Sequence, residues 1–218
     1  MSMLFDEQQS PSSGDPHPSS QKIFQIFQQW WHVVTHPQKQ TLGDAMDKAT
    51  WRGVILQLLM LVIGAGLWFS LVSVMRSFPS FIGPFASLSL MIPSLLILLL
   101  TVPLSIAILH GLALLFGGKG TLLQWTYTNL LFLVPLFLVQ QLLQTLFGTL
   151  IFPLLPFSML GNMIGNLPSS VIIIYIAVLQ VFALGAVHRL SMKNAMMALL
   201  ILIALALPSL WLLSIILI

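Results

Sequence analysis

The sequence predicts an all-α fold: a polytopic membrane bundle of five transmembrane helices preceded by a short amphipathic cytoplasmic helix. Composition is the first observation behind this prediction, because 58% of the 218 residues are hydrophobic and only 6% are charged. A soluble domain carries about 25% charged residues, so this chain cannot cover a water-facing surface. The second observation is that the apolar residues gather in stretches of membrane length, separated by short polar or glycine-rich turns.

The distribution of charge and the lack of cysteine exclude several classes of function. All five acidic residues lie within the first 47 positions, and the chain has no cysteine. Disulfides, thiolate metal sites and cysteine nucleophiles are therefore excluded, and two-carboxylate or serine-triad sites have no supply of acids inside the bundle. The eight basic residues are scattered over loops, which indicates membrane topology and not a nucleic-acid-binding surface. We expect a protein that is not an enzyme, needs no cofactor or metal and binds no nucleic acid.

The first 50 residues divide into a tail and a helical segment. Residues 1–20 are polar, rich in Ser and Pro and without the features of a signal peptide, and they predict a disordered cytoplasmic tail. Residues 21–50 predict a cytoplasmic or interfacial helical segment. In 21–34 apolar residues recur at helical spacing, with polar side chains on the other side, namely Gln25, Gln28, Gln29 and His32. This helix either lies at the membrane interface or packs against the protein. A second helix is expected to begin near Thr41, with its acids near the N-terminal end.

Residues 51–218 predict the membrane domain. Crossing the ~30 Å hydrocarbon core takes about 20 helical residues. Five segments are long and apolar enough: 54–75, 90–116, 122–147, 170–187 and 195–217. Each must be helical, because lipid offers no partner for backbone N–H and C=O groups. The connection 148–168 is apolar but broken by proline and glycine, so we interpret it as an interfacial loop, with a short re-entrant helix as the alternative.

The basic residues predict the orientation. With the amino terminus in the cytoplasm, seven of the eight Lys and Arg residues lie inside and only Arg76 lies outside. This is a strong positive-inside bias. The prediction therefore places the carboxyl terminus outside and two short turns, 117–121 and 188–194, in the cytoplasm.

A glycine turn between the second and third predicted spans is the first candidate site. Gly117, Gly118 and Gly120 surround Lys119, the only charge between Arg76 and Arg189. Glycine permits the left-handed backbone angles of a tight turn. A Walker phosphate loop needs G-x-x-x-x-G-K-[ST] after a strand, so nucleotide binding is disfavoured. The candidate surface for lipid or partner contact comprises Gly117, Gly118, Lys119, Gly120, Arg189 and Lys193.

Polar side chains within the predicted spans form the second candidate set. His110 is expected to hydrogen-bond inside the bundle and His188 to join Arg189 at the lipid headgroups. A metal or proton shared by the two imidazoles is the sharper alternative, which lacks an acid to complete it. Amides in the spans are expected to face inward, each worth about 1 kcal/mol between helices, or else to line a polar path for a solute. They are Gln57, Gln124, Asn129, Gln140, Gln141, Gln144 and Gln180.

The order of these residues resembles the Yip family of Ypt/Rab-interacting membrane proteins, in its bacterial branch. His110, the GGKG turn, Gln124 and Pro135 are similar to the hairpin between that family's second and third spans. Two other stretches are similar to segments before the family's first and last spans: WWHVVTHPQKQTLGDAMDKATWRG, and Gly185 to Ser191 with Asn194 and Ala195. The resemblance covers about residues 22–217. It implies five spans, a cytoplasmic amino terminus and a bacterial inner membrane.

The resemblance implies no catalytic residue. Eukaryotic members of the family bind Rab-type GTPases, but the short polar tail is closer to bacterial members, so that role is not carried over. The leading hypothesis is a non-enzymatic protein that acts through lipid or protein contacts at the cytoplasmic face, in membrane organisation or a trafficking-like role. Its expected partners are the bilayer and proteins recruited by the amino-terminal region, and an oligomer is compatible with the small pair Gly66 and Ser70. The alternative is a small-solute transporter or channel that uses the intramembrane glutamines.

Overall fold

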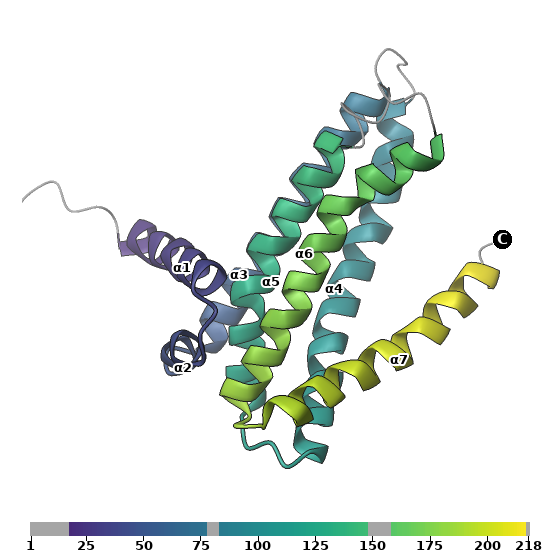
Figure 1. Cartoon of the computed structure of the whole chain (residues 1–218). Coiled ribbons are helices and arrows are strands. Elements are labelled where there is room, and N and C mark those ends of the chain that lie inside the picture. Colours follow the sequence, from purple (N-terminus) through teal and green to yellow (C-terminus); the bar gives the residue numbers. More distant parts are fainter. Residues whose placement is uncertain (1–17, 78–82, 148–157, 217–218) are drawn as a thin grey trace, which may run out of the picture.

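The computed structural model describes residues 18–77, 83–147 and 158–216, and within these ranges it is entirely helical apart from short connections (Figure 1). The all-α prediction is confirmed for this part of the chain. The helices are α1 (Pro18–Thr35), α2 (Lys39–Met46), α3 (Trp51–Ser77), α4 (Gly83–Leu115), α5 (Leu122–Leu146), α6 (Ser158–Val187) and α7 (Met192–Ile216).

Four long helices, α3 to α6, lie side by side in an elongated bundle, and α7 diverges from it (Figure 1). The central helix is α5, which packs against α3, α6, α4 and both amino-terminal helices. Half of its apolar stretch is buried inside the protein, against 11% for α4. The core therefore runs along α5, while α4 keeps most of its apolar surface outside.

Among the described residues, four helices are long and apolar enough to cross a membrane: Trp51–Val72, Met91–Leu115, Leu122–Leu146 and Leu167–Val187. They coincide with the first four predicted spans. Over the residues whose side chains are described, α7 is apolar from Met192 to Leu205, a shorter stretch. Exposed side chains recur every four residues along α3, at Ile55, Leu59, Ile63 and Leu67. Such a continuous apolar stripe is suited to contact with lipid tails.

The predicted loop 148–168 is wrong in its second half. α6 begins at Ser158 and continues through Pro168 to Val187 as one helix, so 158–168 is neither a loop nor a separate re-entrant helix. Proline removes one backbone bond, but a non-helical path through an apolar environment leaves many more backbone groups unpaired. α4 also begins earlier than predicted, at Gly83 and not at residue 90. A helical path pairs the backbone groups of this apolar segment, which an extended path would leave unpaired. Residues 148–157 lie outside the described part.

The amino-terminal helices pack across α5 and α6, with α1 transverse to the bundle (Figure 1). On α2, Leu42 is fully buried. The second helix begins at Lys39, two residues before the predicted Thr41, and it is short, so Asp44 falls in its second half and Asp47 caps its C-terminal end. The expectation of acids at its N-terminal end is therefore wrong. Most of the tail predicted for residues 1–20 lies outside the described residues, and α1 already begins at Pro18.

Candidate functional site

The two turns predicted from the sequence lie together at one end of the bundle, called here the turn end (Figure 1). One turn joins α4 to α5 and the other joins α6 to α7. The Lys119 backbone N–H donates to the His188 carbonyl oxygen at 3.2 Å, which ties the two turns together. Gly117 has a φ of 82°, which confirms the predicted left-handed glycine. The Gly118 N–H donates to the Ala113 carbonyl at 2.9 Å and closes the last turn of α4.

Gly118 and Gly120 are needed for a different reason, the close approach of the turns. A Cβ atom on Gly118 would lie 2.7 Å from the Ala113 carbonyl oxygen and 2.9 Å from the Cβ of His188. A Cβ atom on Gly120 would lie 2.6 Å from the Val187 carbonyl oxygen. Carbon atoms do not approach backbone oxygens that closely, so any side chain at either position would push the two turns apart.

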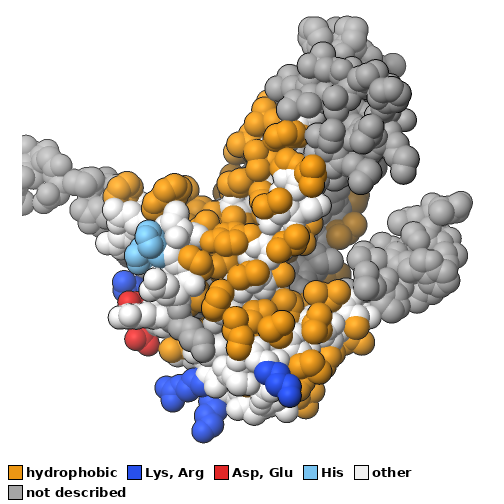
Figure 2. All heavy atoms as spheres, viewed as in Figure 1, with side chains coloured by type: hydrophobic (Ala, Val, Ile, Leu, Met, Phe, Trp, Pro, Cys, Tyr) orange, Lys and Arg blue, Asp and Glu red, His pale blue; other side chains and the backbone are white. Residues whose placement is uncertain are grey.

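The paired turns expose three cations. Lys119, Arg189 and Lys193 are all exposed, and Figure 2 shows Lys and Arg side chains gathered at this end, below a surface dominated by hydrophobic side chains. Arg189 has a φ of 55°, a left-handed conformation that costs about 1 to 2 kcal/mol for a residue with a Cβ. That conformation turns the chain sharply after α6, so the Arg189 side chain is exposed while the residue before it is buried.

Two histidine side chains, His110 and His188, are in contact on the side of the turns that faces the bundle. His110 Nδ1 lies 3.4 Å from His188 Nε2, and the ring centroids are 5.0 Å apart. The Trp125 ring packs against His188 at 5.7 Å, and its Nε1 donates to the Ile106 carbonyl at 2.8 Å. His188 is fully buried, so the expectation that it joins Arg189 at the headgroups is wrong. The glycine turn covers the His188 ring, an arrangement that the sequence alone did not indicate.

The buried position of His188 fixes its charge. Burial, and to a smaller degree the neighbouring His110 imidazole, lowers the pKa of His188 to about 4. The ring is therefore neutral near pH 7. Its Nδ1 has no hydrogen-bond partner among the described residues. Those residues contain no group of three or more potential His, Cys, Asp or Glu metal ligands, and two imidazoles supply only half of a usual zinc coordination shell.

The predicted amides are spread over the bundle and do not form one site. Gln124 closes a capping box at the start of α5: the Thr121 N–H donates to Gln124 Oε1 at 3.2 Å, and the Gln124 N–H donates to Thr121 Oγ1 at 3.3 Å. Gln57 and Asn129 are buried, and their amide atoms have no hydrogen-bond partner in the described part. The remaining amides vary in exposure: Gln140, Gln141 and Gln180 are half-buried and Gln144 is exposed.

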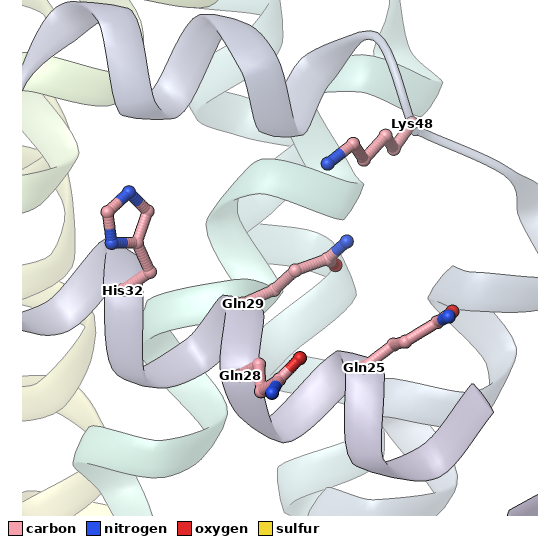
Figure 3. A pocket seen from close by; sticks show the side chains of 5 residues that line it. All are labelled: Gln25, Gln28, Gln29, His32 and Lys48. Atoms are coloured by element: carbon pink, nitrogen blue, oxygen red, sulfur yellow. The ribbon is translucent and has the colours of Figure 1, made fainter. Parts of the chain in front are cut away.

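A polar pocket lies between α1 and the turn that follows α2 (Figure 3). It has a volume of about 490 Å³ and is lined by Gln25, Gln28, Gln29, His32 and Lys48. In Figure 3 the side chains of Gln25, Gln29 and Lys48 extend into the same space from the two segments. The helical spacing of the first four residues was visible in the sequence. Sequence reasoning missed the pocket because the approach of Lys48 depends on how α2 folds back.

Around its axis, α1 has three distinct faces. One face is buried against the protein, with Ile26, Trp30 and Val33. The second face carries the polar residues of the pocket. The third is apolar yet exposed, with Phe24 at 62%, Phe27 at 52% and Trp31 at 73% exposure. The sequence left open whether this helix packs on the protein or has a face for the membrane, and its geometry is compatible with both at once.

Comparison with known proteins identifies one family. The model of the Yip1 domain family matches residues 31–213 of the chain. No curated protein and no solved structure matches the chain.

Proposed function

The chain belongs to the Yip1 domain family, and from that premise we propose that it acts without catalysis, through contacts of its turn end with lipid headgroups and partner proteins. Its family and its long apolar helices make it an integral membrane protein. The proposal adds that α7 is the fifth span, that the turn end and the amino terminus are cytoplasmic, and that the membrane is a bacterial inner membrane. The positive-inside distribution of Lys and Arg supports this orientation.

The observation that carries the proposal is the pairing of the two turns. A main-chain hydrogen bond and two glycines without room for a side chain hold the turns in one arrangement. Lys119, Arg189 and Lys193 are thereby displayed as a preformed cationic surface. A cytoplasmic leaflet rich in anionic lipid attracts each such residue by about 1 kcal/mol. All five acids lie in the first 47 residues, so no carboxylate within the turns competes for these cations.

The third face of α1 supports a position at the bilayer surface. A transverse helix whose exposed aromatic side chains lie beside its polar face is typical of helices at the boundary of headgroups and acyl chains, where Trp is favoured. In this position Phe24, Phe27 and Trp31 point towards the acyl chains, and the polar face of α1 contacts the headgroups and water.

Replacing Lys119 with Glu tests the proposal. We expect weaker binding of anionic lipid and a changed set of proteins recovered by cross-linking from native membranes. Lys119→Arg keeps the charge and serves as the matched control, with no change expected. If Lys119→Glu left lipid binding, partner recovery and topology all unchanged, the cationic surface would have no role and the proposal would be wrong.

A further inference from the structure

We propose that the pocket between α1 and Lys48 binds the phosphate-bearing headgroup of an anionic phospholipid. This inference rests on the proposed function in placing α1 at the membrane surface. It goes further in assigning a specific site, outside the paired turns, and a class of ligand.

The lining of the pocket favours an anionic ligand rich in hydrogen-bond acceptors. Every lining residue can donate hydrogen bonds, Lys48 carries a positive charge, and none of the described lining residues is acidic. Asp44 on the neighbouring α2 and Asp47, which follows that helix, are exposed and lie outside the lining. Lys48 forms no ion pair among the described residues. A lysine ammonium beside amide N–H donors is suited to binding phosphate oxygens.

One of the donors is already oriented. The Tyr127 hydroxyl of α5 donates to Gln29 Oε1 at 2.8 Å. This hydrogen bond occupies the acceptor end of the Gln29 amide and leaves the Nε2 group, with its two hydrogens, as the end available to a ligand. Because Tyr127 is itself buried in the bundle core, it fixes the donor side of the pocket to a rigid helix.

The position of the pocket on α1 favours a lipid over a soluble phosphate compound. The pocket face is flanked along the helix circumference by the exposed aromatic face of Phe24, Phe27 and Trp31. A phospholipid seated here would place its phosphate near Lys48 and its acyl chains along the aromatic face. The amides of Gln25 and Gln28 can both donate and accept hydrogen bonds, so they suit the hydroxyl groups of a glycerol headgroup. Phosphatidylglycerol meets all of these requirements.

Native mass spectrometry of the full chain in non-ionic detergent tests the site. The probes are dihexanoyl phosphatidylglycerol, dihexanoyl phosphatidylcholine and inorganic phosphate, each titrated until a single bound molecule is resolved. We expect phosphatidylglycerol to bind at least tenfold more tightly than phosphatidylcholine. Lys48→Gln should weaken its binding by about tenfold, whereas Arg52→Gln, which removes an exposed charge outside both the pocket lining and the paired turns, should change it less than twofold. Thermal unfolding of both variants establishes that each remains folded.

The outcomes distinguish a failure of the pocket alone from a failure of the proposed lipid contact as a whole. Loss of binding in Lys48→Gln alone supports the pocket. Equal weakening by both substitutions would show diffuse attraction to surface cations, which overturns the pocket and leaves the cationic surface intact. Equal affinity for both lipids, unaffected by either substitution, would overturn the pocket and remove lipid contact from the proposed function. Inorganic phosphate binding as tightly as phosphatidylglycerol would overturn the assignment to a lipid.

Discussion

The paired turns and the α1 pocket are both polar regions of a largely apolar molecule, but they are built in different ways. In the paired turns the main chain sets the shape, because Gly118 and Gly120 leave no room for a single methyl group. In the pocket, side chains from two separate segments meet around an open space. The difference teaches that the turns behave as a rigid unit in which small changes are costly, whereas the pocket can change its chemistry without disturbing the fold.

The largest effect is expected from Gly120→Val. The added side chain would be forced against the Val187 carbonyl, so the turns must separate and uncover His188. We expect a loss of about 3 kcal/mol in the free energy of unfolding. The matched control is Gly43→Ala in α2, where nothing lies within 4 Å of the added atom and helix propensity favours alanine. Denaturant unfolding in detergent should show opposite signs for the two variants, and equal stability would contradict the account of the turns.

A comparison of Trp30 with Trp31 separates the buried face of α1 from its exposed aromatic face. Trp30 is 5% exposed and Trp31 73% exposed, although they are neighbours in the sequence. Trp30→Ala should cost about 3 kcal/mol of stability, because it opens a cavity against the bundle. Trp31→Ala should change the free energy of unfolding in detergent by less than about 0.5 kcal/mol. On transfer from detergent to bilayers, the tryptophan fluorescence of the wild-type protein should change more than that of the Trp31→Ala variant. The reverse order of stabilities would mean that α1 packs by its other face.

Acid should destabilise the paired turns through His188. Its pKa in the folded protein is about 4, below the ordinary value of 6.5, so the folded state resists protonation. The stability associated with the neutral ring is complete above pH 6.5 and is lost as the pH falls from 6.5 towards 4, by about 2 to 3 kcal/mol. Unfolding measured at pH 7 and pH 4.5 should reveal this loss, and His188→Asn should reduce it. An unchanged pH profile in that variant would assign the acid sensitivity to other groups.

The smallest effect is expected from Tyr127→Phe, which connects the bundle core to the pocket. It removes the hydrogen bond to Gln29 while keeping the ring that packs against Gly53. We expect a loss of about 1 kcal/mol in stability, together with weaker binding of phosphatidylglycerol, because the Gln29 amide is no longer held. If lipid affinity stayed at the wild-type value, the orientation of Gln29 would have no part in binding.

Local patterns in the sequence were sufficient to predict the helices and the glycine turn. The apolar stretches had the length of a span, and the φ of Gly117 followed from the need to end α4 at a tight turn. Proline was a weaker guide, because Pro168 lies inside α6, where the apolar surroundings favour an unbroken helix. The burial of His188 and the position of Lys48 were not predictable, because each depends on which distant segment folds over it.

The proposed contact surface depends most on the sidedness of the turn end, and the absence of native cysteine allows a direct test with single-cysteine labelling. The full chain with Lys119→Cys and, separately, with Arg76→Cys would be treated with a membrane-impermeant maleimide in right-side-out and inside-out vesicles. We predict that position 119 reacts only in inside-out vesicles and position 76 only in right-side-out vesicles. Labelling of position 119 from the outside would contradict the orientation and, with it, the proposed cytoplasmic contact surface.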